Sequence, residues 1–264
     1  MQRLLLALVL VGMAVAGARA EDGKALMGKV YAAYAGLRSY TQTVSGSVVE
    51  RIGGQTRGVA GQTAEVHYEK PNRLYVTVTS PQTGTVAAFS NGREMTVYRS
   101  RYDTYMKFPA PPTAAEFVKS LGKFGVVAQL DALDFLAGNT ADSFVSSYSS
   151  PTTAKVNGVV CYVVTGTLKP MRSARSARIT YWVDQRSHLI RKLQLEKNGV
   201  PTPVRVVRTV KGKQVASVRV ILVDNSVTET IQEMQPNPSL SDAAFSYRIP
   251  PSATQQDPAK ALGQ

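Results

Sequence analysis

The sequence has few of the residues from which enzymes and metal proteins commonly build their sites. Its 264 residues include one cysteine, one tryptophan and two histidines. It contains no zinc-protease, paired-cysteine, nucleophile-elbow, Walker or dinucleotide-binding motif. We therefore predict that the protein is not an enzyme, and that it uses neither a metal nor a cofactor.

The remaining candidates for chemistry are weak. His67 and His188 fall on or beside separate predicted strands, where a surface or edge position is favoured over catalysis or metal binding. Ser120 and Lys123 fit the S-x-x-K pattern of penicillin-recognising enzymes, but the partner motifs K-T-G and S-x-N are absent. We interpret this match as chance and name no catalytic residue.

The single cysteine excludes an intramolecular disulfide, so the core alone must hold the fold together. Cys161 lies within the apolar run from Val159 to Val164, which is typical of a strand. We predict a buried strand residue at this position. A reactive or intermolecular thiol is the alternative.

The first 20 residues have the form of a secretory signal peptide. Arg3 precedes an apolar run from Leu4 to Ala16, and Ala18-Arg19-Ala20 forms a small-x-small cleavage site. A membrane anchor is the alternative, but a run of ~13 residues is shorter than the roughly 20 that span a bilayer. We predict cleavage after Ala20 and a periplasmic protein.

Acidic residues are few beside the basic ones. The chain has 31 lysines and arginines against 18 acidic residues, and the excess is concentrated between Thr167 and Leu222. A solvated sheet face kept soluble by its charge accounts for this region. The alternative is a docking surface for an anionic membrane or an acidic envelope protein. Export argues against nucleic acid as a partner.

The strongest structural signal is an antiparallel meander from Gly58 to Phe108. Residues 73–79 alternate, which places Leu74, Val76 and Val78 on one apolar face and polar side chains on the other. Asn91-Gly92 separates two further strands and predicts a type I′ hairpin turn, and Asn157-Gly158 and Asn198-Gly199 likewise predict hairpins. The same pattern predicts strands at 40–51, 58–69, 159–168, 177–184, 189–197, 204–210, 214–223 and 245–249.

Three helical segments accompany these strands. The first spans residues 23–36, and the second begins at Thr113, where Glu116 completes a capping box. The third ends at Gly138-Asn139, a pair suited to a left-handed cap. It carries one apolar stripe, which suits either a fixed core helix or a mobile cover: Val126, Leu130, Leu133 and Leu136. We predict one domain at 21–252 after the signal peptide at 1–20, and a disordered tail at 253–264.

Several motifs occur together in a recognisable order. They are Lys70-Pro71-Asn72-Arg73-Leu74, Ser90-Asn91-Gly92-Arg93 before Val97-Tyr98, helical Leu133 to Ala137, and Phe245 to Pro251. In this order the chain resembles the periplasmic outer-membrane lipoprotein carriers and their LolA-like relatives from about Lys24 to Ser252. The resemblance implies a mainly β, α+β fold: an unclosed antiparallel half-barrel, LolA/LolB-like, with helices covering its concave face.

The resemblance also implies a function. A periplasmic carrier or chaperone would bind lipid or lipoprotein acyl chains in the apolar concavity, without a covalent step. The alternative on the same fold is a protein-binding sensor or regulatory domain of the cell envelope. Lipoprotein carriers have arginine where this chain has Lys70, so Lys70 is only a candidate lid latch. The expected lining residues are Leu74, Val76, Val78, Met95, Val97, Leu133 and Leu136; a register slip of one residue would exchange Val97 for Thr96 or Tyr98.

Overall fold

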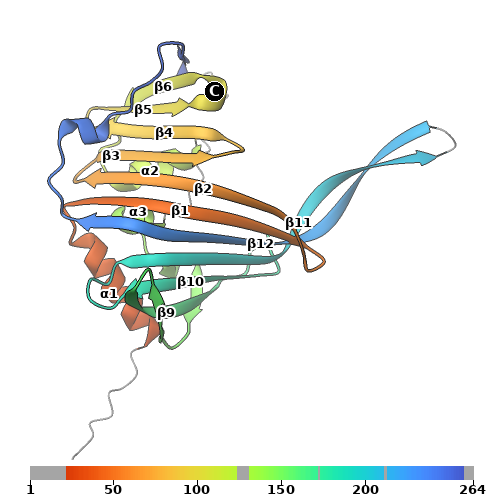
Figure 1. Cartoon of the computed structure of the whole chain (residues 1–264), viewed down its shortest axis with the longest axis horizontal. Coiled ribbons are helices and arrows are strands. Elements are labelled where there is room, and N and C mark those ends of the chain that lie inside the picture. Colours follow the sequence, from red (N-terminus) through yellow and green to blue (C-terminus); the bar gives the residue numbers. More distant parts are fainter. Residues whose placement is uncertain (1–21, 124–130, 172, 211–212, 259–264) are drawn as a thin grey trace, which may run out of the picture.

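A computed structural model describes residues 22–123, 131–171, 173–210 and 213–258. Within these residues, one sheet of 13 strands holds the fold together, in the order β13-β6-β5-β4-β3-β2-β1-β12-β11-β10-β9-β7, with β8 paired to β9. All neighbouring strands are antiparallel except β13 and β6. Figure 1 shows the sheet as an open, twisted surface with helices on one side. This is the unclosed, mainly β fold class expected from the sequence.

The elements have the following bounds. The helices are α1 Gly23–Ala35, α2 Ala114–Lys123 and α3 Asp131–Leu136. The first strands are β1 Ser39–Ile52, β2 Gln55–Glu69, β3 Arg73–Ser80, β4 Gly84–Asn91, β5 Glu94–Arg99 and β6 Thr104–Pro109. The later strands are β7 Val145–Tyr148, β8 Thr152–Val156, β9 Val159–Leu168, β10 Ser176–Asp184, β11 Ile190–Val210, β12 Lys213–Pro236 and β13 Thr254–Gln255.

Local signals placed the helix ends and the first hairpins correctly. The Thr113 hydroxyl accepts a hydrogen bond from the Glu116 N–H at 3.3 Å, as a helix N-cap does. Gly138 has a φ of 79° just after α3, as its predicted cap role requires. The predicted apolar stripe also includes Val126 and Leu130, which lie outside the described residues.

The β4–β5 hairpin forms where Asn91-Gly92 predicts it, with a different turn. Only Gly92 of this pair has positive φ, at 93°, so the turn is not type I′. The Asn91 side chain instead accepts hydrogen bonds from the N–H groups of Arg93 and Glu94, both at 2.9 Å. Local side-chain bonding of this kind is why asparagine favours turns of several types.

In the second half of the chain, two predictions were wrong and one stretch of strand was missed. Asn198-Gly199 is a bulge inside one long strand, not a hairpin turn, because Gly199 takes a φ of 62° and its N–H bonds the Asp224 carboxylate at 2.8 Å. Residues 224–236 continue β12 against β1, although their polar sequence gives no strand signal. Residues 245–249 form no strand, because Phe245 closes a 3₁₀ turn and packs under Arg73.

The predicted disordered tail also needs correction. Thr254 and Gln255 pair in parallel with Thr104 and Tyr105 of β6, at the edge of the sheet. The Thr254 N–H bonds the Asp103 carbonyl at 2.9 Å. The tail therefore covers an otherwise open strand edge, which a polar composition alone does not reveal.

The main core lies between the helices and the inner face of the sheet. Helix α1 contributes Leu26, Met27, Val30 and Tyr34, which are at most 1% exposed. Phe117 and Leu121 of α2 and Phe135 of α3 belong to the same apolar cluster. Cys161 is fully buried, as predicted, and burial raises the pKa of its thiol.

Candidate functional site

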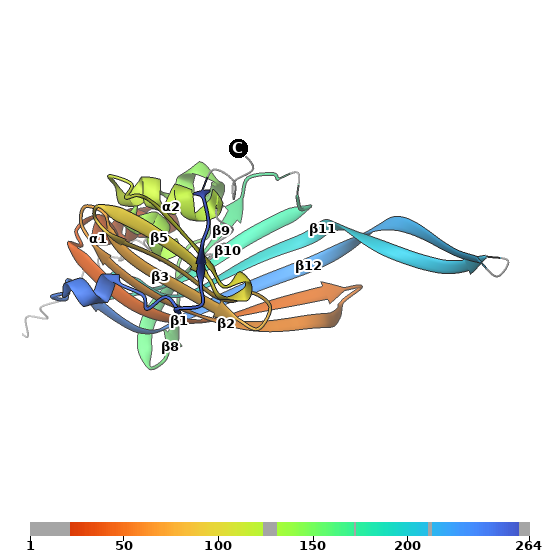
Figure 2. The same cartoon turned by 90° about the horizontal axis from the view of Figure 1, so that it is seen from above.

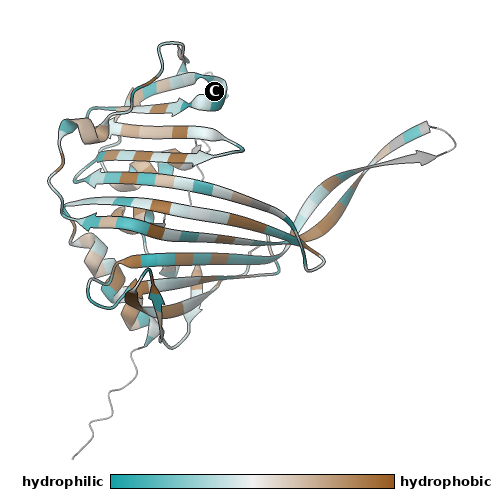
Figure 3. Cartoon of the chain, viewed as in Figure 1, coloured by the Kyte–Doolittle hydropathy of each residue, from teal (hydrophilic) through white to brown (hydrophobic). Residues whose placement is uncertain are grey.

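The inner face of the sheet is built from alternate residues of neighbouring strands. Leu74, Val76 and Val78 of β3 are at most 9% exposed and belong to the cluster that includes the helices. Their cross-strand neighbours are Tyr68, Val66 and Ala64 on β2, and Ser90, Ala88 and Val86 on β4. Figure 3 shows the resulting alternation of hydrophobic and hydrophilic residues along the strands. The polar alternates, Tyr75 and Thr77 among them, face away from the helices.

The structure brings all seven expected lining residues into one apolar cluster. Besides the three from β3, the cluster holds Met95 and Val97 of β5 and Leu133 and Leu136 of α3. Val97 lies opposite Ala88 and Met106, so it shares their inner face. In this structure the helices close over these residues, and each is at most 9% exposed.

Strand β5 is buried on both faces. This explains why the sequence did not decide whether Val97 or its neighbours point inward. Thr96 and Tyr98, beside Val97, are each 3% exposed but are not part of the inner cluster. The ring of Tyr247, from the chain segment after β12, stacks on Tyr98 with centroids 5.5 Å apart. The C-terminal segment therefore covers the outer face of β5.

The apolar inner face continues past the helices as an open groove. Val48 lies four residues from buried Val44 on β1, so both point to the same face. Ala60 of β2 and Val227 of β12 are opposite Val48, and Leu195 of β11 is opposite Val227. Figure 2 shows these strands running beyond the helices. The sequence prediction missed these four groove residues, although the alternation along β1 indicates that Val48 lies on the same face as Val44.

Two adjoining cavities give this groove its size. One of about 450 Å³ lies over Val48 and Ala60, and one of about 130 Å³ lies over Val48, Leu195 and Val227. Polar and charged side chains also line them: Glu50, Gln62, Ser80, Gln82, Thr83, Lys197 and Asn225. An apolar floor with a polar rim matches a ligand that has one oily part and one polar part.

One polar row separates the groove from the closed core. Glu229, 3% exposed, lies opposite Gly46 and Leu193 on the inner face. Gln62 occupies the space that a side chain at position 46 would need. A Cβ on Gly46 would come within 2.7 Å of the Gln62 Cγ. The groove is thus a separate compartment next to the helix-covered core.

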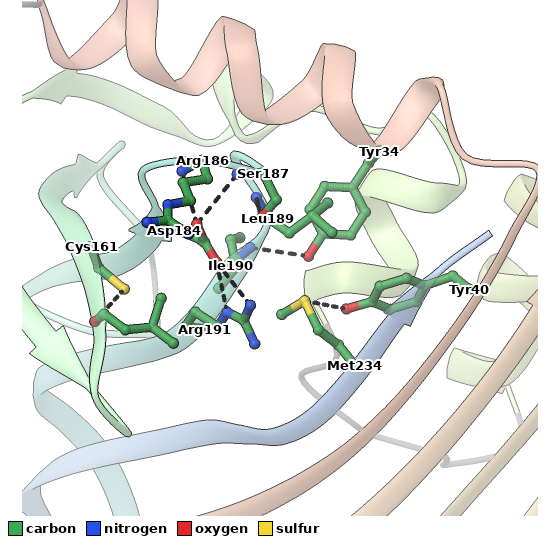
Figure 4. A network of polar contacts seen from close by, with 11 residues as sticks. Tyr34, Tyr40, Cys161, Asp184, Arg186, Ser187, Leu189, Ile190, Arg191 and Met234 are labelled. Atoms are coloured by element: carbon green, nitrogen blue, oxygen red, sulfur yellow. Dashed lines mark hydrogen bonds and ion pairs between the residues drawn. The ribbon is translucent and has the colours of Figure 1, made fainter. Parts of the chain in front are cut away.

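A second cluster of polar groups ties the sheet to α1. Asp184, at the end of β10, accepts hydrogen bonds from the Arg186 and Ser187 N–H groups at 2.8 and 3.3 Å, and from the Arg191 guanidinium at 2.8 and 3.1 Å. The Ile190 N–H donates to the Tyr34 hydroxyl of α1 at 3.3 Å (Figure 4). This network fixes the turn between β10 and β11 under the helix, which is a structural role.

Lys70, the candidate latch, holds the end of α1. Its ammonium donates to the Ala35 carbonyl at 2.7 Å, where a cation favours the helix dipole. Replacing Lys70 by Met should lower the free energy of unfolding by about 0.5–1 kcal/mol, measured by urea denaturation. Lys70→Arg is the control and should behave like the wild type. An unchanged urea midpoint for Lys70→Met would show that the bond does not hold the helix.

Neither a metal cluster nor a membrane-spanning helix is found among the described residues. No group of three or more His, Cys, Asp or Glu side chains in this part of the chain is placed to hold a metal ion. None of the helices seen there has the length and apolar character needed to cross a bilayer.

Comparisons with solved structures match the chain to several proteins at low identity. One is a DUF1329 family protein from Desulfovibrio piger, with 14% identity, 86% of this chain and 98% of that chain covered, and a TM-score of 0.32. A putative outer membrane lipoprotein-sorting protein domain from Vibrio parahaemolyticus has 9% identity, coverages of 84% and 95%, and a TM-score of 0.33. A LolA superfamily protein from Nitrosomonas europaea has 11% identity, coverages of 86% and 99%, and a TM-score of 0.30.

The family model that matches this chain is more informative. It covers residues 24–257, almost the whole described chain, and its family is described as a predicted periplasmic protein, DUF2092. No curated protein is significantly similar to the chain. The description agrees with the export signal read from the first 20 residues. The chain therefore belongs to the DUF2092 family of periplasmic proteins.

Proposed function

We propose that this protein binds the acyl chains of lipids or lipoproteins, non-covalently, and carries them through the periplasm. The observation that supports this proposal is the open groove at Val48, Ala60, Leu195 and Val227, which extends the inner face beyond the helices. An apolar surface left open to water is costly unless something covers it for part of the time. An acyl chain has the shape and chemistry to do so.

The dimensions suit such a ligand. The larger cavity, about 450 Å³, falls in the range of about 300–1,000 Å³ that is usual for small-molecule sites. Burying one methylene contributes about 0.8 kcal/mol, so a dozen buried carbons contribute about 10 kcal/mol before the cost of ordering. Affinity should therefore rise with chain length. Binding of this kind needs no chemical step, so we propose a binding protein and not an enzyme.

We also propose that the helix-covered core is a second part of the same binding site. Leu74, Val76, Met95 and Val97 belong to the apolar cluster that includes residues of α2 and α3. We propose that these helices act as a lid, and that their displacement lets a longer chain pass the Glu229 row and reach this surface. The polar rim, with Glu50 and Lys197, would remain with the head group.

A pair of neighbouring substitutions tests the groove. Val48→Asp should weaken binding of a fluorescent fatty acid about 10- to 100-fold, because it replaces an apolar contact worth about 1.5–3 kcal/mol by a charge. Val49→Asp, one residue along β1 and on the opposite face, is the matched control and should bind like the wild type. If the wild type and both variants bind the fatty acid equally, the groove is not the binding site.

The natural cargo can be identified directly. Protein purified under native conditions should release lipid on organic extraction, detected by mass spectrometry. If the wild type neither retains lipid nor binds a fatty acid after delipidation, the carrier proposal fails. The protein-binding sensor or regulatory domain would then be the better explanation of the same fold.

A further inference from the structure

The last part of β11 and the first part of β12 form a two-stranded ribbon that leaves the sheet. Residues 200–210 pair with residues 213–223, beyond the point where β1 ends its pairing with β12 at Asp224. At ~3.3 Å per residue, eleven residues of strand reach roughly 35 Å. Figures 1 and 2 both show this ribbon projecting away from the rest of the molecule.

One side of the ribbon is apolar and exposed. Val218, Val220 and Leu222 alternate along β12 and are 72%, 66% and 41% exposed. Pro201 and Pro203 of β11, opposite Leu222 and Val220, are also exposed on this side. The described chain exposes six large hydrophobic residues, and three of them lie within these five residues of one strand. Scattered surface hydrophobics are ordinary, whereas a cluster on a projecting element indicates a contact surface.

The charge of the ribbon has one sign. Residues 199–223 contain no aspartate or glutamate, and they contain five basic residues. Arg205 lies opposite Val218 and so shares the apolar side, whereas Arg219 lies opposite Val204 on the other side of the ribbon. Both arginines are exposed. A partner that covers the valines must therefore also accept positive charge.

The ribbon is poorly suited to pairing with another strand along its β11 edge. Pro201 and Pro203 have no N–H to donate, and proline on an edge strand prevents strand addition. An isolated two-stranded ribbon is also only marginally stable in water. A surface that shields the apolar side without requiring backbone pairing fits these features best.

We propose that the ribbon docks on an anionic phospholipid membrane. Val218, Val220 and Leu222 enter the boundary between head groups and acyl chains, while Arg205, on the same side, binds the phosphates and Arg219, on the other side, adds to the electrostatic attraction. This surface lies apart from the groove, so membrane docking and acyl-chain binding can be tested independently. It brings the protein to the membrane by an element that is not part of the inner face.

The test is co-sedimentation of the mature chain with lipid vesicles. Binding to mixed phosphatidylglycerol–phosphatidylcholine vesicles is expected at low salt, with weaker binding at high salt and to phosphatidylcholine alone. Each basic residue near an anionic surface strengthens binding about fivefold, so R205Q/R219Q should lower partitioning more than about tenfold. The variant V218S/V220S should lower it by a similar factor.

Matched controls separate the ribbon from general surface effects. Lys155→Gln removes an exposed charge from β8, and Val160→Ser removes a valine that is 42% exposed on β9. Both controls should bind vesicles like the wild type. If the ribbon variants also bind like the wild type, or if the wild type binds no vesicles, the proposal is overturned. Loss of self-association without loss of vesicle binding would assign the ribbon to a second copy of the chain, which overturns it as well.

The depth of contact can be read from a single label. Cys161 is the only cysteine of the chain and is fully buried, so Val220→Cys provides one accessible thiol for an environment-sensitive dye. The dye emission should shift to the blue when anionic vesicles are added. The same dye on Val160→Cys should not shift. Fatty-acid binding, measured on the ribbon variants, should be unchanged, which distinguishes failed docking from failure of the carrier proposal.

Discussion

The double substitution Leu133→Asp/Leu136→Asp is expected to abolish fatty-acid binding and to lower the free energy of unfolding by at least about 4 kcal/mol. Both leucines lie on α3 and are 3% and 7% exposed in the main core. Removing a buried leucine side chain costs about 2–5 kcal/mol, and a carboxylate in its place adds a desolvation cost. Helix α3 should therefore leave the sheet.

Two measurements separate loss of the cover from loss of the fold. The strand signal in circular dichroism should persist at low temperature, because the backbone pairing of the sheet does not involve α3. Asp134→Asn is the control on the same helix. Asp134 is half-buried and its carboxylate accepts a hydrogen bond from the Asn139 side chain at 3.1 Å, so only a small effect is expected. A double variant that bound the fatty acid like the wild type would show that α3 is not part of the site.

Replacing Asp184 by alanine is expected to lower the free energy of unfolding by about 3 kcal/mol. The carboxylate is 5% exposed and accepts four hydrogen bonds from Arg186, Ser187 and Arg191 (Figure 4). Losing it leaves buried donors unsatisfied and the Arg191 charge without its partner. Asp184→Asn keeps one acceptor oxygen and should cost less.

An exposed ion pair on the neighbouring strands provides the control. Glu196 of β11 pairs with Arg178 of β10, whose side chain is 59% exposed. Glu196→Gln should cost less than about 1 kcal/mol, because surface ion pairs contribute little. Urea denaturation of the three variants gives the comparison. Equal losses for Asp184→Ala and Glu196→Gln would contradict a structural role for the buried network.

The same carboxyl makes stability depend on pH in the acid range. Burial opposes its ionisation, but the Arg186 and Ser187 N–H groups and the Arg191 guanidinium outweigh burial and lower the pKa of Asp184. The folded state therefore binds this proton less readily than the unfolded chain. The stabilisation is present above the ordinary aspartate pKa of about 3.9 and is lost as the pH falls through the lower folded value. Asp184→Asn should remove this part of the acid dependence.

The first half of the sheet was predictable because its signals are local. Alternation over residues 73–79 decides which side chains share a face, and Thr113 and Gly138 are suited to helix ends by their own side chains and backbone freedom. Asn157-Gly158 likewise turns the chain between β8 and β9, with φ values of 47° and 80°. Each of these features depends on residues next to one another in the sequence.

The second half shows where local signals fail. Residues 224–236 alternate poorly in hydropathy, yet they form the strand that joins the two parts of the sheet, because β1 and β11 supply partners on both sides. Asn198-Gly199 is as good a turn signal as Asn157-Gly158. It becomes a bulge because the Asp224 carboxylate accepts the Gly199 N–H and both strands continue. Long-range pairing overrode propensity in both places.

By itself, the sequence determined the antiparallel meander, the helix ends and which residues of β3 share an apolar face. The tertiary structure decided how far that face is covered. Leu74 and Val48 carry similar side chains on strands of one sheet, but the helices close over Leu74 and stop short of Val48. The ribbon is a second case, because its strands pair only with each other once β1 ends, and the valines there are exposed. Burial depends on which elements meet in space, and a strand pattern records only which side chains point the same way.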